Sequence, residues 1–166
     1  MPYIVDGNNL LWASFGQRDV ELSAAVMVGH CVRLLWAVSR YLQRTNEQAE
    51  VVFDGPEPAD LSRFQHIPHI TVWFAGPGRQ ADGWIEERLR SYKPDKPLTV
   101  VSSDRRLRQA AIQVHAGQIR SEAFWEQVLA AQTKETRPNE PPAKMEGLSQ
   151  SETELWMRIF GIEEGP

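Results

Sequence analysis

Cysteine is almost absent from this 166-residue chain, and a long apolar run is missing altogether. The single cysteine, Cys31, excludes an intramolecular disulfide and any zinc site built from several cysteines, and it favours a reducing compartment. Uncharged apolar stretches such as 34–38 are far too short to cross a bilayer. No basic and apolar leader precedes Asp6. The sequence therefore predicts a cytoplasmic protein with no membrane segment and no secretory signal.

An excess of positive charge is also missing. The chain has 18 Lys and Arg residues against 22 Asp and Glu residues, a formal net charge of −4. A protein that coats nucleic acid through its overall field is usually basic, so this balance argues against that class. It leaves open an enzyme that meets phosphate groups through a metal ion.

Short apolar runs alternate with amphipathic helical patterns along the first 131 residues. Strands followed by helices in this way are typical of parallel pairing, so the alternation predicts an α/β sandwich. The predicted strands are 3–5, 51–53, 70–74, 98–101 and, more weakly, 118–119. The predicted helices are one capped at Asp19 whose apolar face runs over 25–42, then 80–92, 105–112 and a last one that begins at 121.

The composition changes after residue 131. Residues 132–150 are rich in Pro, Glu, Lys, Asn and Gln, which predicts a flexible linker. A capping-box pattern from Ser151 to Glu154 then predicts a short amphipathic helix over 151–162. Two interpretations of this helix stay open, since it can dock on its own domain or on a protein partner. The predicted organisation is thus a domain over 1–131, a linker and a C-terminal helix.

Aspartates lie at or near the carboxyl ends of the predicted strands. Asp6, Asp54 and Asp104 each come directly after a strand or its turn, and Asp82 lies in the first turn of the helix that follows the third strand. Ligands bind at the carboxyl ends of strands in an open parallel sheet, where the strand order reverses. Turn formation and the helix dipole explain any one of these residues equally well. The convergence of Asp6, Asp82 and Asp104 on one edge favours a site.

Carboxylates that lie close together repel each other, and burial strengthens the repulsion, so they need a proton or a cation between them. A set of hard oxygen ligands without His or Cys points to Mg²⁺ or Mn²⁺. These ions support phosphodiester hydrolysis without a side-chain nucleophile. The aspartates therefore predict a divalent-metal site for phosphate chemistry.

Four sequence blocks resemble the YacP-like group in the NYN branch of the PIN-like nucleases. These are 3–10 (YIVDGNNL), 51–55 (VVFDG), 78–86 (GRQADGWIE) and 100–104 (VVSSD), and the resemblance covers about residues 1–130. It implies a PIN-like three-layer α/β/α fold with a mainly parallel sheet, and divalent-metal-dependent endoribonuclease activity. RNA is the implied substrate, with translation-associated RNA and the ribosome among the candidate partners. The linker and the C-terminal helix lie outside the resemblance.

Position by position, the resemblance assigns the catalytic and metal-binding roles to Asp6, Asp82 and Asp104. Asp54 matches a further acid of the family and is a fourth candidate metal ligand. Asn9 and Ser103 match polar residues that orient the site. Two departures lie around Asp82, because the family often has a second acid where this chain has Gly83, and an acid or Thr where it has Gln80. One metal is therefore expected to bind tightly and a second only with substrate.

Several other polar residues lie beside the predicted site. Arg79, Arg105 and Arg106 are predicted to grip RNA phosphates, because the guanidinium group binds phosphate bidentately. Asn8 either orients bound groups through its amide or serves only to form a turn. Glu86 is either an outer metal ligand or, preferably, the i,i+4 partner of Arg90.

The aromatic residues allow two interpretations. Trp12 follows the first aspartate block and is suited either to stack on a nucleobase or to fill the core. Trp73 and Trp84 are expected in the core.

Two other functions remain as alternatives. A non-catalytic RNA- or ribosome-binding adaptor could use the same fold, although an adaptor has no need to keep repelling carboxylates together. A phosphatase usually has a second Asp two residues after its nucleophile, where this chain has Asn8. A receiver-like domain needs a Lys after its last strand, where this chain has Arg120. The metal-dependent endoribonuclease is therefore favoured.

Overall fold

The computed structural model describes residues 2–16, 24–93 and 97–133, so the predicted helix cap Asp19 lies outside the described residues. All of them belong to one compact unit, Met1–Thr136. Strands and helices alternate along it, as the sequence predicts. In chain order the elements are β1 (Pro2–Asp6), α1 (Gly7–Phe15), α2 (Ala24–Thr45), β2 (Gln48–Phe53), the short 3-10 helix η1 (Ser62–Phe64), β3 (Ile70–Phe74), α3 (Ala81–Arg90), β4 (Thr99–Val101), α4 (Arg105–Gln113), β5 (Gly117–Ile119) and α5 (Ser121–Thr133).

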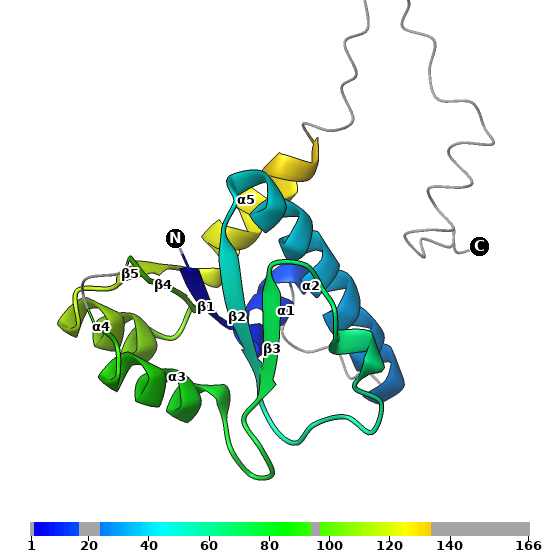
Figure 1. Cartoon of the computed structure of the whole chain (residues 1–166), viewed down its shortest axis with the longest axis horizontal. Helices are drawn as coiled ribbons and strands as arrows, with labels where there is room; N and C mark the ends of the chain where they lie inside the picture. The colour runs from blue at the N-terminus through cyan, green and yellow to red at the C-terminus, as the bar shows by residue number, and fades with distance from the viewer. Residues whose placement is uncertain (1, 17–23, 94–96, 134–166) are drawn as a thin grey trace, which may run out of the picture. The chain divides into compact units, whose positions relative to one another are not determined.

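The strands form a single parallel sheet in the order β3-β2-β1-β4-β5 (Figure 1). β1 is central, and the chain adds β2 and β3 on one side of it and β4 and β5 on the other. The strand order therefore reverses between β1 and β4, which is where ligands bind in open parallel sheets. The predicted α/β fold is confirmed, and the structure shows that β1 and β4 are neighbours.

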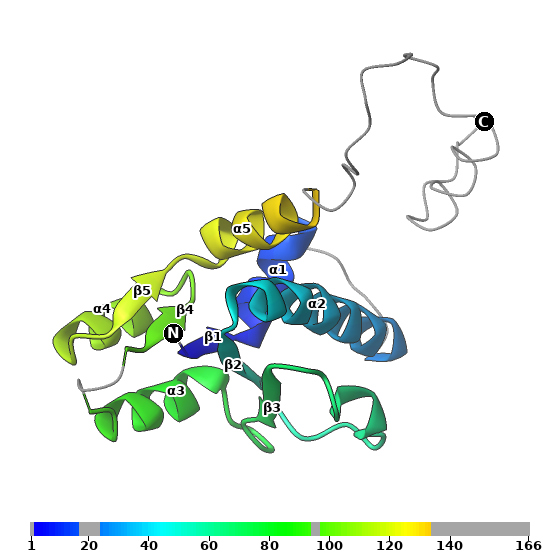
Figure 2. The same ribbon diagram turned by 45° about the horizontal axis from the view of Figure 1, so that its top comes forward.

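Helices cover both faces of the sheet and give three layers (Figure 2). On one face α1, α2 and α5 pack against strand residues such as Val5, Val51 and Val101. On the other face α3 and α4 pack against Ile4 and Val100. Successive strand residues point to opposite faces, so neighbouring valines and isoleucines fill two separate cores.

The segment after β1 differs from the expectation. The sequence predicts a turn after Asp6, but these residues are the first turn of helix α1. Asp6 is the N-cap, and its carboxylate accepts a hydrogen bond from the backbone N–H of Asn9. Leu10 and Leu11 are then buried within the domain. Asp and Asn serve helix starts as well as turns, so composition alone does not distinguish the two.

Gly7 allows α1 to start very close to the sheet. A Cβ at this position would lie 2.7 Å from the ring of Phe53 and 2.9 Å from the carbonyl oxygen of Val52. Such contacts are too short for any side chain, so glycine lets the helix N-terminus pack against the end of β2.

Trp73 corrects a second expectation, whereas Trp84 is partly buried and packs against the core between the sheet and α3, as predicted. Trp73 lies on the edge strand β3 and is 44% exposed, so it is a surface residue and not part of the core. Its ring lies 5.7 Å from that of Trp84. Edge strands have no neighbour on one side, which explains why an aromatic residue here stays accessible.

The end of the described chain bears on the predicted linker. Helix α5 runs to Thr133, so Gln132 and Thr133 are helical although the sequence predicts a linker from residue 132. The rest of the predicted linker and the helix over 151–162 lie outside the described residues. Within the described ranges, no helix is both long enough and apolar enough to cross a membrane.

Candidate active site at the carboxyl edge of the sheet

Asp6 lies at the end of the central strand and is only 2% exposed. One carboxylate oxygen accepts the backbone N–H of Asn9 at 3.0 Å, and the other accepts the Asn9 side-chain amide at 2.5 Å. The hydroxyl of Ser102 donates to that second oxygen at 3.2 Å. Burial raises the pKa of Asp6, and these hydrogen bonds oppose the rise only in part. Asp6 is thus a fixed acid whose negative charge is costly.

Ser102 links Asp6 to Asp104. Its hydroxyl donates to Asp6 and accepts the backbone N–H of Asp104 at 3.0 Å. Asp104 is the N-cap of α4, and its carboxylate accepts the backbone N–H of Arg106 at 2.6 Å. A fully buried serine therefore connects the ends of β1 and β4 across the point where the strand order reverses.

Sequence reasoning selects Ser103 and misses Ser102. The Ser103 hydroxyl donates to Glu122 at 2.5 Å and accepts the backbone N–H of Ser121 at 3.2 Å, so it faces α5. Strand alternation provides the signal that separates the two serines. Val101 points into the core under α5, so Ser102 points to the other face, where α3 and α4 lie.

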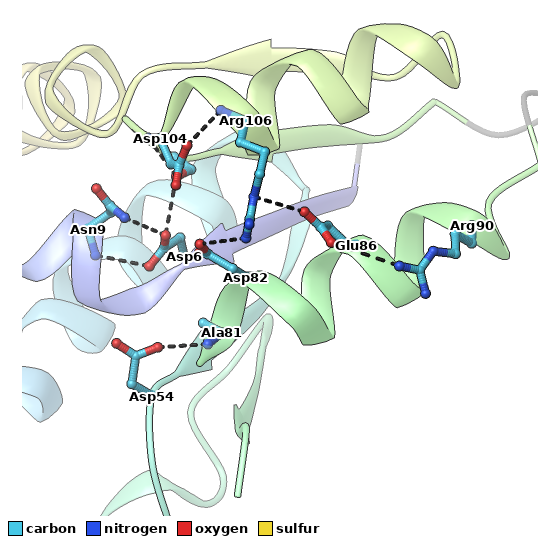
Figure 3. Close-up of polar contacts among 10 residues, drawn as sticks. Asp6, Asn9, Asp54, Ala81, Asp82, Glu86, Arg90, Asp104 and Arg106 are labelled. Atoms are coloured by element: carbon cyan, nitrogen blue, oxygen red, sulfur yellow. Dashed lines mark hydrogen bonds and ion pairs between the residues drawn. The ribbon is translucent and has the colours of Figure 1, made fainter. Parts of the chain in front are cut away.

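Asp82 reaches the site from the first turn of α3, and its side chain is 22% exposed. Burial raises its pKa, and the negative charges of Asp6 and Asp104 raise it further. The guanidinium of Arg106 acts in the opposite direction. Figure 3 shows the side chains of the three aspartates at the same edge of the sheet.

Arg106 connects α4 to α3 through two ion pairs. Its Nη2 atom lies 3.1 Å from Asp82, and its Nε atom lies 3.0 Å from Glu86 (Figure 3). Glu86 also faces Arg90 at 3.8 Å, which confirms the expected i,i+4 pair. The Arg106 side chain is 64% exposed, so it neutralises the acids from the solvent side.

Asp54 is the fourth acid at this edge and caps helix α3 from a different strand. The α3 N-cap residue Gln80 makes no side-chain capping bond, and Asp54 accepts the backbone N–H of Ala81 at 2.7 Å instead. The side-chain oxygen of Asn8 accepts the backbone N–H of Asp54 at 3.0 Å. Asn8 and Asp54 therefore position the helix that carries Asp82.

The other two predicted arginines lie close to this edge in sequence. Arg79 precedes α3 and Arg105 is the first residue of α4, and both are exposed. In the part of the chain that the structure describes, neither forms an ion pair. Of the three predicted arginines, only Arg106 contacts the aspartates.

The donor set has the chemistry that a hard divalent cation requires. The carboxylates lie at one edge, where burial and then their mutual repulsion raise the pKa of Asp82, and a cation would relieve that repulsion. Among the residues described, no three carboxylate, imidazole or thiolate groups are already arranged as a metal site. Arg106 instead lies beside Asp82. The residues fit Mg²⁺ or Mn²⁺ in kind, with Arg106 as a competing cation.

A parallel sheet with aspartates where its strand order reverses occurs in nuclease-type α/β domains, and the family match assigns the chain to that class. The chain belongs to the YacP-like NYN domain family, whose domain matches residues 3–160. None of the curated proteins compared with it matches the chain.

Two solved structures share the fold. The structure of Rae1 (YacP) from Bacillus subtilis is 21% identical with a TM-score of 0.67, and the match covers 82% of this chain and 78% of the other. The structure of a tryptophan-to-leucine mutant of Rae1 is 21% identical with a TM-score of 0.62, and the match covers 80% of this chain and 77% of the other. At this identity the likeness concerns the fold alone.

The family match corrects one boundary. The sequence blocks predict a resemblance that stops near residue 130, but the match continues to residue 160 and includes the segment predicted as linker and helix. A segment rich in Pro, Glu and Lys has few positions that constrain residue type, so the sequence blocks alone do not reveal its membership.

Proposed function

We propose that this chain is a divalent-metal-dependent endoribonuclease that hydrolyses phosphodiester bonds in RNA. The observation that carries the proposal is the convergence of Asp6, Asp82 and Asp104 where the strand order reverses, with Asp6 almost fully buried. Membership of a nuclease-type family supports it. Keeping three repelling carboxylates together is costly unless they bind a cation.

In this proposal Asp6, Asp82 and Asp104 hold Mg²⁺ or Mn²⁺, with Asp54 as a further ligand or as the residue that positions α3. The bound cation would activate water and stabilise the charge that develops on the phosphate. Asn9 and Ser102 keep the Asp6 carboxylate in one orientation through their hydrogen bonds.

The arginines serve the substrate in this proposal. Arg106 lies next to the acids and is suited to bind an RNA phosphate once a cation takes over the neutralisation of Asp82. Arg79 and Arg105 are exposed, lie close to the same edge in sequence and would add contacts with the RNA backbone. Ser103 acts indirectly, because its hydroxyl anchors the start of α5. Translation-associated RNA in the cytoplasm is the first substrate class to test.

A non-catalytic RNA-binding adaptor is the second candidate, and one observation favours it. Arg106 already neutralises Asp82 and Glu86, so the acids do not strictly need a metal. An adaptor of this kind would bind RNA without cleaving it.

The test is RNA cleavage by the purified full chain. We expect cleavage of a mixed RNA pool with Mg²⁺ or Mn²⁺ and none with EDTA. Asp6→Asn and Asp104→Asn should each lower the rate by roughly 100-fold or more, because each removes a cation ligand. Asn retains the ability to cap a helix, so both variants should fold.

Asp60→Asn is the matched control, since Asp60 is exposed and in the described structure bonds only Ser62. It should cleave like the wild type. RNA binding without cleavage in any metal would support the adaptor instead. Hydrolysis of a simple phosphomonoester that depends on Asp6 would identify a phosphatase.

A further inference from the structure

A cleft of about 520 Å³ lies beside the aspartates, along one side of α1. Its lining includes Asn8, Asn9, Trp12, Gly16, Asp54 and Glu122. This volume is within the usual range of about 300–1,000 Å³ for ligand-binding clefts. The name Trp12 cleft is used for it below.

Two residues that line the Trp12 cleft also belong to the candidate active site. Asn9 lines the cleft and also bonds Asp6, and Asp54 lines it and also caps the helix that carries Asp82. In Figure 3, Asn9 and Asp54 lie on one side of Asp6 and Asp82, and Arg106 lies on the other. An RNA strand with one phosphate at the aspartates could therefore place the base of a neighbouring nucleotide in this cleft.

The charge of the described lining disfavours a phosphate group inside the cleft. Two carboxylates, Asp54 and Glu122, belong to the lining, and no lysine or arginine does among the described residues, although Arg120 pairs with Glu122 at 3.5 Å from outside the lining. An anion would be repelled, whereas a neutral group with hydrogen-bond donors would be attracted. The occupant is therefore expected to be a base and not a backbone phosphate.

Trp12 supplies an aromatic surface in the cleft. Its side chain is half-buried, and its ring lies 6.1 Å from that of Phe15 one turn later. Phe15 in turn packs edge-on against His30 at 4.6 Å. Stacking of a base on such a ring contributes about 1–3 kcal/mol.

The hydrogen-bonding groups that remain in the cleft are mostly acceptors. Asn9 directs its amide nitrogen to Asp6, and its oxygen accepts no bond from the described residues. Asp54 and Glu122 each receive their described hydrogen bonds on one carboxylate oxygen, which leaves the other available. Asn8 offers its amide nitrogen as a donor, because its oxygen already accepts the Asp54 N–H.

We propose that the Trp12 cleft binds a nucleobase that carries an amino group, stacked on Trp12 and donating to Asn9, Asp54 or Glu122. Adenine, cytosine and guanine carry such a group, whereas uracil presents carbonyl acceptors at the corresponding edge. The inference rests on the proposed function, because it places this base beside the phosphate that the aspartates would engage. It adds a preference for the base next to the cleavage position.

The test measures binding of labelled single-stranded oligonucleotides of A, C or U to the full chain in EDTA, by fluorescence anisotropy. The A and C oligonucleotides should bind more tightly than U. Trp12→Ala should weaken binding of A and C by about 5- to 150-fold, which corresponds to the loss of one stacked base. Trp12→Phe should retain most of the affinity. Glu122→Gln should reduce the difference in affinity between the A or C oligonucleotides and the U oligonucleotide, because the glutamine amide adds a hydrogen-bond donor that a uracil carbonyl can accept.

Trp36→Ala is the control, since Trp36 is an exposed tryptophan on α2 and does not line the cleft. Equal RNA affinity of Trp12→Ala, Trp12→Phe and the wild type would overturn the inference, and cleavage by the wild type would leave the proposed function intact. Trp12-dependent binding in a wild type that never cleaves RNA would support the cleft and contradict the nuclease proposal. Saturable binding of free adenosine together with no binding of oligonucleotides would overturn the RNA assignment.

Discussion

Asp6 and Asp82 meet in the candidate site, but the contacts that hold them belong to different classes. The hydrogen-bonded half consists of Asp6, Asn9, Ser102 and Asp104, and its contacts are short-range bonds at the ends of neighbouring strands. The ion-paired half consists of Asp82, Glu86 and Arg106, and its contacts join two helices through one long, exposed side chain.

The difference separates a permanent part of the site from an exchangeable part. The loss of a buried hydrogen bond is costly, because the donor or acceptor that remains has no water molecule to bond in place of its lost partner. An exposed ion pair contributes little to stability and exchanges readily with solvent or another ion. The hydrogen-bonded half is thus arranged before any ligand arrives, while the ion-paired half can change partner.

Loss of the Ser102 hydroxyl should have the largest effect on stability. Ser102→Ala leaves Asp6 without one donor and the Asp104 N–H without an acceptor, both in buried or partly buried surroundings. We expect a loss of about 1–3 kcal/mol in the free energy of unfolding, measured by urea denaturation. Ser91→Ala is the control, because Ser91 is exposed and its hydroxyl bonds only the Arg88 carbonyl in the described structure. Equal losses in both variants would contradict a special role for Ser102.

Asp54 should show which of its two roles dominates. Asp54→Ala removes the cap of α3 and should cost about 0.5–2 kcal/mol of stability, with a parallel loss of cleavage. Asp54→Asn keeps a capping oxygen and removes only the charge. If Asp54 positions α3, the Asn variant should retain stability and most activity. If Asp54→Asn keeps its stability but loses as much cleavage as Asp6→Asn, Asp54 is a cation ligand.

The raised pKa of Asp6 predicts a pH-dependent gain in stability for Asp6→Asn without metal. A carboxyl with a higher pKa in the folded protein than in the unfolded chain destabilises the fold as the pH rises from 3.8 through the folded pKa. Removal of that charge should raise Tm by about 2–4 °C at pH 7 in EDTA, which corresponds to about 1 kcal/mol. The gain should vanish as the pH falls to 3.8. A gain that is independent of pH would show that the charge is not its cause.

Of the variants considered, Arg106→Gln should have the smallest effect on stability, but it should change the affinity for a divalent cation. Arg106→Gln should cost under about 1 kcal/mol, since its ion pairs are exposed. Loss of the competing guanidinium should tighten Mn²⁺ binding in the absence of RNA, measured by calorimetry. Arg90→Gln, which removes only the longer pair with Glu86, is the matched control. Weaker Mn²⁺ binding in Arg106→Gln than in Arg90→Gln would contradict the exchange of partners.

Much of the hydrogen-bonded half could be predicted from the sequence, because it depends on strand ends. Apolar runs that stop at Asp6 and Asp104, with strands in parallel, place these acids at one edge. Of the ion-paired half, only the place of Asp82 follows in the same way, from the helix that begins after β3. The choice between Ser102 and Ser103 needs only the alternation of strand residues, which the two cores make visible.

The ion-paired half could not be predicted in the same way. That Arg106 grips an RNA phosphate stays a prediction, but its ion pairs with Asp82 and Glu86 are not foreseen, because they form where α3 and α4 pack side by side on one face of the sheet. The contacts of a long side chain depend on the packing of helices distant in sequence. Capping of α3 by Asp54 is hidden for the same reason, since donor and acceptor are 27 residues apart.

The most direct measurement of the central claim is a Mn²⁺ titration of the purified chain followed by electron paramagnetic resonance. Wild type, Asp82→Asn and the exposed control Asp60→Asn are compared without RNA. A cation site made by the aspartates predicts saturable binding in the wild type and in Asp60→Asn, and binding at least about 10-fold weaker in Asp82→Asn. Equal Mn²⁺ binding by all three proteins would contradict it.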